Sequence, residues 1–257
     1  DIRRGFLYGD GVFETMRVRN NHVVFKEYHI DRLQSAMTKL GLNSGKLDPN
    51  LLEEHINDLT VVNQEGTARV RLVLFRTGSG NYRSGSDQYS WIAESEALDS
   101  DEYPGVDRGL MVGTSENAVV HKHSMSGFKT ISALCYVIAG SECFERGLDD
   151  LVIPDPSGRP SEAISSNIFF LKETDLFTPG LEMGCVDGVI RRVISDKIIE
   201  LGYSLKSCTI TPALISSCSS MYLTNSVSGI QWVADYDGKT FEEGPYKSLL
   251  NFLNKIS

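Results

Sequence analysis

The chain contains 257 residues, 41% of them hydrophobic and 23% charged, a composition that can fill one large core or two modest ones. Its net charge of −9 argues against a nucleic-acid or polybasic membrane partner, since both require a positive surface. No apolar run reaches the roughly 20 residues needed to span a bilayer. Asp1 is not an initiator methionine and no basic-then-apolar leader follows it, so we expect an N-terminal stretch to be missing.

Cysteine usage favours a reducing cytoplasm, because the number of cysteines is odd and no pair has the CxxC spacing of a metal or redox motif. They are Cys135, Cys143, Cys185, Cys208 and Cys218. We interpret Cys135 and Cys143 as small core residues of a helix. His121-Lys122-His123 lacks a third ligand nearby and is read as exposed, so no metal site is predicted.

The first part of the chain alternates extended and helical patterns. Ile30, Leu33 and Met37 recur at helical spacing, and Gly41 marks the end of that helix. The predicted elements are strands over 13–18 and 23–25, helices over 30–40 and 49–59, and strands over 68–76, 89–93 and 109–113. Residues 115–126 have little periodicity, so we place a domain boundary there.

The second part again mixes strands and helices, without a regular βαβ repeat. Its predicted elements are a helix over 134–147, strands over 151–153, 168–171 and 175–178, a helix over 187–201, a strand over 219–223 and a helix over 245–255. The fold class is therefore mixed α/β (α+β) with two domains. We expect a smaller N-terminal α/β domain over 1–117 and a larger C-terminal domain over 118–257.

Two motifs suggest chemistry. Lys129 lies in Ser126-Gly127-Phe128-Lys129-Thr130-Ile131-Ser132, at the end of an expected strand, and Glu162 lies in the next hairpin. An amine that forms a Schiff base and a carboxylate that pairs with a ring nitrogen are what pyridoxal phosphate (PLP) requires. Most such pairs are solvated surface charges, so the interpretation of Lys129 and Glu162 as a PLP site also requires residues that can bind the phosphate.

Three features suit a phosphate. Gly188-Val189-Ile190 begins a helix, where backbone N–H groups favour an anion, although Asp187 as an ordinary N-cap is the alternative. Arg32 lies beside the apolar stripe of its helix and is expected to lean inward, where its guanidinium could bind a phosphate. The alternative is that Arg32 only flanks the core. Thr224-Asn225-Ser226 follows a strand and offers hydroxyl and amide donors, or forms an ordinary turn.

In this order, these motifs resemble the class IV aminotransferases, the PLP enzymes of fold type IV. The resemblance covers nearly the whole chain and also includes Tyr8-Gly9-Asp10-Gly11-Val12-Phe13-Glu14-Thr15, His29-Ile30-Asp31-Arg32-Leu33 and Thr178-Pro179. The family includes branched-chain aminotransferases, D-amino-acid aminotransferases and 4-amino-4-deoxychorismate lyases. It implies a two-domain, D-amino-acid aminotransferase-like fold and a homodimer, with the cofactor between the domains. By the same resemblance, the N-terminal domain lacks the family's first strand, and the C-terminal domain over 118–257 binds PLP.

The resemblance assigns roles to individual residues. Lys129 is the Schiff-base lysine and the base that moves the substrate Cα proton, and Glu162 pairs with the pyridinium nitrogen. The implied phosphate ligands are Arg32, the N–H groups of Val189 and Ile190, and Ser226 with its neighbour Asn225. The implied substrate pocket contains Tyr8, Phe13, Arg17 and Arg71.

Departures from the family pattern favour the lyase branch, which makes the folate precursor 4-aminobenzoate. Ile190 replaces a threonine common in aminotransferases, Leu134 stands where branched-chain enzymes have a tyrosine, and the run from Thr224 to Ile230 differs from their Thr-Ala-Ala-Glu-like sequence near Ser226. Ala163, in place of a common glycine, is a separate departure. Transamination of branched-chain or D-amino acids remains the alternative. A catalytically silent homologue that binds PLP is a further alternative, from a class other than enzymes. A hydrolase that uses Ser126 and Lys129 fits poorly, because the sequence shows no oxyanion-hole signature.

Overall fold

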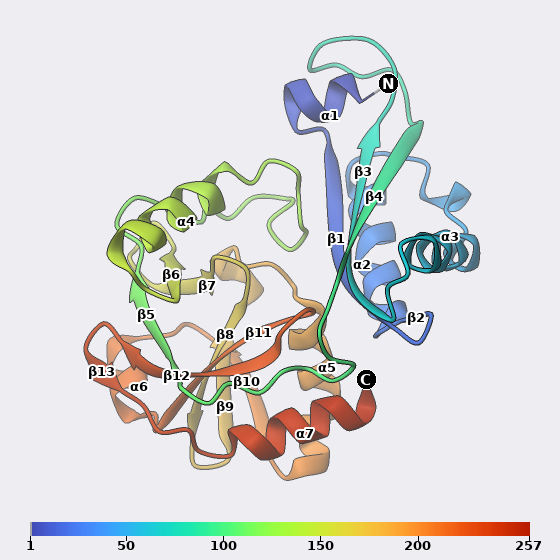
Figure 1. Ribbon diagram of the computed structural model, residues 1–257. Coiled ribbons are helices and arrows are strands. Elements are labelled where there is room, and N and C mark those ends of the chain that lie inside the picture. The colour runs from blue at the N-terminus through green and yellow to red at the C-terminus, as the bar shows by residue number, and fades with distance from the viewer. Residues whose placement is uncertain (1) are drawn as a thin grey trace. The chain divides into compact units, whose positions relative to one another are not determined.

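The computed structural model describes residues 2–257 and divides into two compact units (Figure 1). The N-terminal unit comprises the chain up to Glu102 together with Phe128–Ser132 and Ser257. The C-terminal unit comprises Tyr103–Gly127 and Ala133–Ile256. Residues 103–117 therefore belong to the C-terminal unit, and the Lys129 segment belongs to the N-terminal unit. Both assignments differ from the domain boundary that we expected between residues 117 and 118. The physical reason is strand pairing, described for each unit below.

The N-terminal unit is a four-stranded antiparallel sheet in the order β2-β1-β3-β4. Its strands are β1 (Gly11–Arg19), β2 (His22–Val23), β3 (Thr67–Arg76) and β4 (Tyr89–Ala97). Its helices are α1 (Arg3–Tyr8), α2 (Lys26–Lys39) and α3 (Pro49–Val62), with the short 3₁₀ turn η1 (Ser44–Lys46). The predicted strands and the helices α2 and α3 are confirmed, whereas α1 was not predicted.

The two faces of this sheet differ, because side chains alternate along a strand. Val12, Met16 and Val18 are buried on the face toward α2. On β4, Trp91 lies on the same face and its ring is 5.7 Å from that of His55 in α3. Helices therefore cover one face, and the opposite face carries Phe13.

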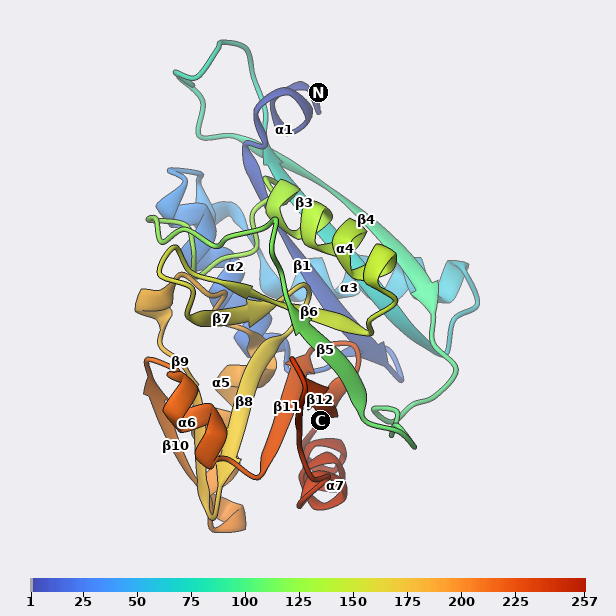
Figure 2. The same ribbon diagram turned by 90° about the vertical axis from the view of Figure 1, so that its left-hand side faces the viewer.

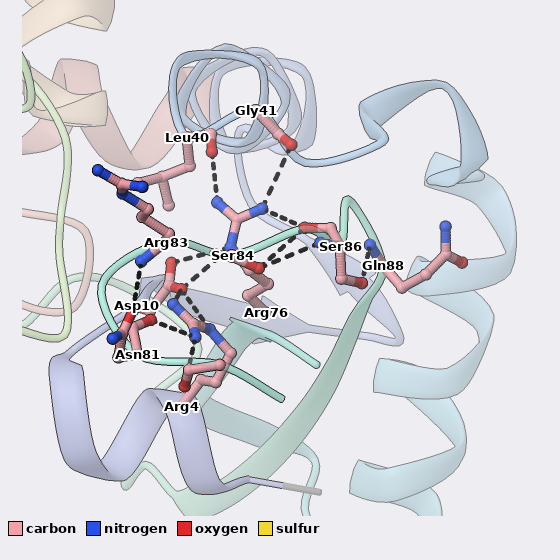
Figure 3. Close-up of polar contacts among 11 residues, drawn as sticks. Arg4, Asp10, Leu40, Gly41, Arg76, Asn81, Arg83, Ser84, Ser86 and Gln88 are labelled. Atoms are coloured by element: carbon pink, nitrogen blue, oxygen red, sulfur yellow. Dashed lines mark hydrogen bonds and ion pairs between the residues drawn. The ribbon is translucent and has the colours of Figure 1, made fainter. Parts of the chain in front are cut away.

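A buried ionic network holds the start of β1 in place (Figure 3). The Asp10 carboxylate accepts from Arg4 Nε at 2.8 Å and from Arg76 Nε at 3.0 Å. Arg76 also donates to the carbonyls of Leu40 and Gly41, at the end of α2. Because Arg4 donates to the carbonyls of the Gly-rich loop at residues 80–81, the network ties that loop, α1 and α2 to β1.

The C-terminal unit is built on a nine-stranded mixed sheet (Figure 2). The main path runs β10-β9-β8-β11-β12-β5-β6-β7, and β13 pairs with β12. Its strands are β5 (Leu110–Thr114), β6 (Asp150–Pro154), β7 (Pro160–Ala163), β8 (Asn167–Lys172), β9 (Asp175–Pro179), β10 (Ser204–Cys208), β11 (Ser220–Asn225), β12 (Gly229–Tyr236) and β13 (Lys239–Thr240). Since β5 pairs in parallel with both β12 and β6, the segment before residue 117 is locked into this unit.

The helices of the C-terminal unit cover this sheet. They are α4 (Leu134–Arg146), α5 (Val189–Lys197), α6 (Pro212–Ser217) and α7 (Tyr246–Ile256), with the 3₁₀ turns η2 (Leu181–Met183) and η3 (Ile198–Leu201). The predicted helices are confirmed; α6 and the strands β10, β12 and β13 were not predicted, and β7 was expected only as part of a hairpin without bounds. Ile168, Phe170, Met221 and Leu223 share one core cluster on one face of the sheet. Among residues 2–257, no helix combines the length and apolar character needed to cross a membrane.

Helix α4 has an unexpected orientation. The apolar residues that predicted this helix are largely exposed, with Leu134 at 70% and Phe144 at 88% of their full accessible surface. Ala139 and Cys143 are buried instead, and α4 contacts β6. Cys143 is thus a core residue as predicted, whereas Cys135 is only half-buried. The helix was identified correctly by its spacing, but spacing does not tell which stripe faces the sheet.

Candidate functional site

The segment that carries Lys129 lies against the start of β1. The N–H of Phe13 donates to the Lys129 carbonyl at 2.8 Å, and the N–H of Ile131 donates to the Gly11 carbonyl at 3.1 Å. Thr130 forms an isolated bridge with Val12, so Lys129 precedes a bridge and does not end a regular strand. These contacts fix the backbone from which the lysine side chain extends.

Glycine is required in the Gly9-Asp10-Gly11 motif because the Lys129 segment approaches so closely. A Cβ atom at Gly11 would lie 2.4 Å from Ile131 Cδ1 and 2.4 Å from the Leu74 carbonyl oxygen. Gly9 has a φ of +60°, and a Cβ there would lie 2.2 Å from Ser132 Oγ. The two glycines therefore make room for the residues that directly follow Lys129.

On the sheet face opposite α2 and α3, two cations lie near one aromatic ring. The Phe13 ring centroid is 4.9 Å from Lys129 Nζ and 4.0 Å from Arg71 Cζ, both within cation–π range. Burial, together with the charge of the neighbouring Arg69, lowers the pKa of Arg71 from its usual value. Lys129, Phe13 and Arg71 are thus brought together as a reactive amine beside a partly desolvated carboxylate-binding group.

The other two residues expected in the substrate pocket make structural contacts. Arg17 is buried and donates to the carbonyls of Ser100 and Glu102, the latter at 2.8 Å. The Tyr8 ring lies 5.3 Å from the Tyr82 ring and 5.2 Å from Arg4 Cζ. Both side chains hold neighbouring segments of the N-terminal unit, and their roles toward a substrate stay predictions.

Arg32 leans inward as expected and is 4% exposed, but its main contacts were not predicted. Its Nε and Nη2 atoms donate to the two oxygens of Glu14, at 2.7 Å and 2.6 Å. His29 Nδ1 lies 2.7 Å from Glu14 Oε2. Burial by itself raises the pKa of Glu14, but the Arg32 charge and the hydrogen bonds from His29 and Arg32 outweigh it and lower the pKa to about 2.

Glu14 and His29 are therefore partners of the candidate site residue Arg32 to which the motifs assigned no role, although a signal was present. Glu14 is in phase with the buried Val12 and Met16 at the strand period of two, and a carboxylate on a buried face needs a cationic partner. His29 and Arg32 are three residues apart on one face of α2.

In the C-terminal unit, Glu162 is buried on β7 and its two oxygens are held by different donors. The Tyr136 hydroxyl donates to Oε1 at 2.7 Å, and the N–H of Val186 donates to Oε2 at 2.9 Å. Neither donor was predicted. The carboxylate is thereby fixed in orientation, as pairing with a ring nitrogen would require.

Helix α5 begins at Val189, and the expected alternative of an Asp187 N-cap is wrong. The N-cap is Gly188, and within the described residues no side chain caps the helix. Asp187 pairs instead with Arg191, at 2.9 Å. The first-turn N–H groups, including those of Val189 and Ile190, are thus not used by a side-chain cap and are available to an anion.

The turn after β11 is shaped by Asn225. Its Oδ1 accepts from the N–H groups of Val227 and Ser228, and its Nδ2 donates to Ser166 Oγ at 3.1 Å. Ser226 is half-buried within this turn. In the part of the chain that the structure describes, the buried Thr224 hydroxyl has no hydrogen-bond partner. The contacts of Asn225 build the turn that presents Ser226, so its support of a phosphate site is indirect.

These groups match the chemistry of PLP. Lys129 offers an amine for the aldehyde and Glu162 an oriented carboxylate for the ring nitrogen. The uncapped α5 N-terminus, the Arg32 guanidinium and the hydroxyl groups at the turn are groups of the kind that donate hydrogen bonds to a phosphate.

Sequence comparison identifies the class. The model of the family "Amino-transferase class IV" matches residues 11–236, which is most of the chain. The protein therefore belongs to the class IV aminotransferase family, whose enzymes use PLP, and its two-unit mixed fold is the fold of that family.

The similar proteins include lyases. The chain is 27% identical to an aminodeoxychorismate lyase of Bacillus subtilis over 87% of this chain and 76% of that protein. It is 22% identical to an aminodeoxychorismate lyase of Vibrio harveyi over 88% of this chain and 83% of that protein. A crystal structure of a putative 4-amino-4-deoxychorismate lyase from Legionella pneumophila superposes with a TM-score of 0.87 at 22% identity, covering 99% and 93% of the two chains. Branched-chain and D-alanine aminotransferases are also among the relatives.

Proposed function

We propose that this enzyme converts aminodeoxychorismate into 4-aminobenzoate and pyruvate, with PLP held by Lys129, Glu162, Arg32, Ser226 and the N–H groups of Val189 and Ile190. The observation that carries the proposal is that Lys129 Nζ and Arg71 both lie within cation–π distance of the Phe13 ring. The substrate carries two carboxylates, and a half-buried arginine beside the reacting amine suits one of them.

Bound PLP supplies an electron sink that acidifies the C–H bond next to the substrate nitrogen. The chain's own groups then direct the reaction. Lys129 Nζ removes the proton from the carbon that bears the amino group, and the C–O bond to the enolpyruvyl group breaks as the ring becomes aromatic. The released enolpyruvate takes up one proton to become pyruvate, so the reaction requires no amino acceptor.

Two side chains favour the lyase over an aminotransferase. Ile190 has no hydroxyl to add to the phosphate contacts, and its side chain is buried in the first turn of α5. Leu134 is 70% exposed and has no polar group to offer a cofactor. Amino-acid transamination is the second candidate, favoured by the branched-chain and D-alanine aminotransferases among the relatives.

The test supplies purified, PLP-loaded enzyme with aminodeoxychorismate alone, and separately with a branched-chain amino acid or D-alanine plus 2-oxoglutarate. Equal amounts of pyruvate and 4-aminobenzoate, formed without a 2-oxo acid, support the lyase. Glutamate formed in step with amino-acid consumption, together with no 4-aminobenzoate, overturns the lyase proposal in favour of transamination. Full PLP loading without turnover of any of these substrates supports the silent homologue instead.

We also propose a homodimer in a reducing cytoplasm. The exposed apolar stripe of α4, which includes Leu134, Val137, Ile138 and Phe144, supports an interface with a second copy. The five free cysteines support a reducing compartment. Sedimentation measures the oligomeric state, and Phe144→Asp is expected to shift it from dimer to monomer. A monomeric wild-type protein would contradict the homodimer.

A further inference from the structure

Tyr136 lies in the first turn of α4, and its hydroxyl donates to Glu162 Oε1 at 2.7 Å. Burial, and then the negative charge of Glu162, raise the pKa of this phenol far above its usual value. The phenol therefore keeps its proton, and its role toward the carboxylate is that of a hydrogen-bond donor.

The opposite oxygen of Glu162 is held by backbone. The N–H of Val186 donates to Oε2, and the Val186 carbonyl accepts from Asn167 Nδ2 at 2.8 Å. Asn167 Oδ1 would lie 1.9 Å from a Cβ at position 188, so the approach of Asn167 to the start of α5 requires glycine there. The Oε2 contact is thus made by the backbone segment that leads into α5, whereas the Tyr136 contact to Oε1 is made by a side-chain hydroxyl that a substitution can remove.

We propose that Tyr136 is a positioning residue that holds Glu162 in its ionised form and in the orientation that pairs with the PLP ring nitrogen. The inference rests on the proposed function, because it assigns Glu162 to that nitrogen. A hydrogen bond to a carboxylate stabilises the charged form, so the proton between carboxylate and ring stays on nitrogen. Loss of the hydroxyl weakens this preference without removing the carboxylate.

The aromatic ring of Tyr136 has a separate, structural role. It packs against a small apolar cluster that includes Ala118, Val120, Ala139 and Ile153. Phenylalanine keeps this packing, so Tyr136→Phe removes the hydroxyl alone. A matched control is Tyr222→Phe, since Tyr222 is fully buried in the same unit and its hydroxyl donates to the Glu243 carbonyl at 3.1 Å.

The experiment loads wild-type, Tyr136→Phe and Tyr222→Phe proteins with PLP labelled with ¹⁵N at the ring nitrogen. In Tyr136→Phe we expect the ¹⁵N resonance to move toward the unprotonated position and the Kd for PLP to rise about tenfold, about 1.4 kcal/mol. We expect neither change in Tyr222→Phe, although this variant also loses a tyrosine hydrogen bond. Thermal unfolding of both variants compares their losses of stability.

The outcomes separate this inference from the proposed function. A wild-type protein that binds no PLP, or a labelled ring nitrogen that is unprotonated in the wild type, overturns the placement of Glu162 and the inference with it. A protonated nitrogen in the wild type whose resonance and Kd are unchanged in Tyr136→Phe overturns the role of Tyr136 alone. An equal resonance shift in Tyr222→Phe also overturns it, since the effect would then be a general response to losing a buried phenol.

Discussion

The Glu14 carboxylate occupies the Nε–Nη2 edge of the Arg32 guanidinium, with both donor–acceptor distances below 2.8 Å. This bidentate pair is almost fully buried, with Glu14 at 2% and Arg32 at 4% exposure. It fixes the plane of the guanidinium, so any phosphate bound by Arg32 meets a group whose orientation is set in advance. His29 completes the arrangement by contacting the second oxygen of Glu14.

Glu14→Gln should strongly destabilise the protein. The substitution removes the anionic partner from the buried Glu14–Arg32 pair, which costs about 3 to 5 kcal/mol in free energy of unfolding. Urea denaturation measures this loss. The control is Glu96→Gln, because Glu96 pairs with Arg69 but is 71% exposed, and such pairs contribute about 0 to 1 kcal/mol. Equal losses in the two variants would contradict a structural role for the buried pair.

The same pair predicts an acid dependence. The pKa of Glu14 falls from an ordinary 4.5 to about 2 in the fold, so folding favours its ionised form. Its contribution to stability is complete above about pH 4.5 and is lost as the pH falls toward 2. The difference in unfolding free energy between wild type and Glu14→Gln should therefore narrow over that range. A difference that stays constant from pH 5 to about pH 2 would contradict the assignment.

The sequence predicted the position of Arg32 but not its partner. Arg32 is one turn from Ala36 on the inner side of α2, and helical spacing alone places it near the core. Glu14 comes from a strand, and its pairing with Arg32 depends on how α2 packs on β1. Tyr136 and Glu162 are likewise distant in sequence and meet only through the packing of α4 on β6 and its neighbour β7.

The domain boundary shows the same limit. Segment 115–126 lacks periodicity, and for that reason we placed the domain boundary there. In the structure, β5, which precedes this segment, joins the large sheet of the C-terminal unit. The Lys129 segment, which follows it, forms hydrogen bonds with β1 of the N-terminal unit. Both assignments depend on pairing between residues far apart in the chain. Local patterns identify strands but do not identify their neighbours.

Lys129→Ala should abolish the visible absorption band of the bound cofactor, because no other amine would replace the Schiff base that the family motif assigns to Lys129. Absorption spectroscopy of the PLP-loaded proteins checks this. Lys122→Ala is the matched control, since Lys122 is exposed and only a few residues away in sequence. An unchanged band in Lys129→Ala would overturn the assignment of the lysine.

Gly11→Ala should displace the segment that carries Lys129. The added methyl group meets Ile131 Cδ1 and the Leu74 carbonyl oxygen at 2.4 Å, and the latter is backbone that cannot easily yield. We expect a loss of about 1 to 3 kcal/mol in stability and weaker PLP binding. Gly66→Ala is the control, because a Cβ at Gly66 meets no described atom within 4 Å. If Gly11→Ala binds PLP like the wild type, the two glycines do not position Lys129.

Asp150→Asn should stabilise the protein at neutral pH. Burial raises the pKa of Asp150 from 3.8 to about 6, although the N–H groups of Leu151 and Ile164 donate to it. Its ionised form is therefore disfavoured in the fold, and stability falls as the pH rises through this range. Asparagine keeps the accepting oxygen without the charge, so we expect a gain of about 1 to 3 kcal/mol above pH 6 that disappears below pH 3.8.

The adjacent aspartate provides a control of opposite sign. Asp149 accepts hydrogen bonds from Arg108, which lower the pKa of Asp149 below its usual value. Asp149→Asn should therefore reduce stability at neutral pH, and this loss should shrink in acid as the wild-type carboxylate is protonated. Thermal unfolding of both variants across the pH range measures the two trends. A lower stability of Asp150→Asn than of wild type at pH 8 would show that the carboxylate charge is compensated within the fold and would contradict the prediction.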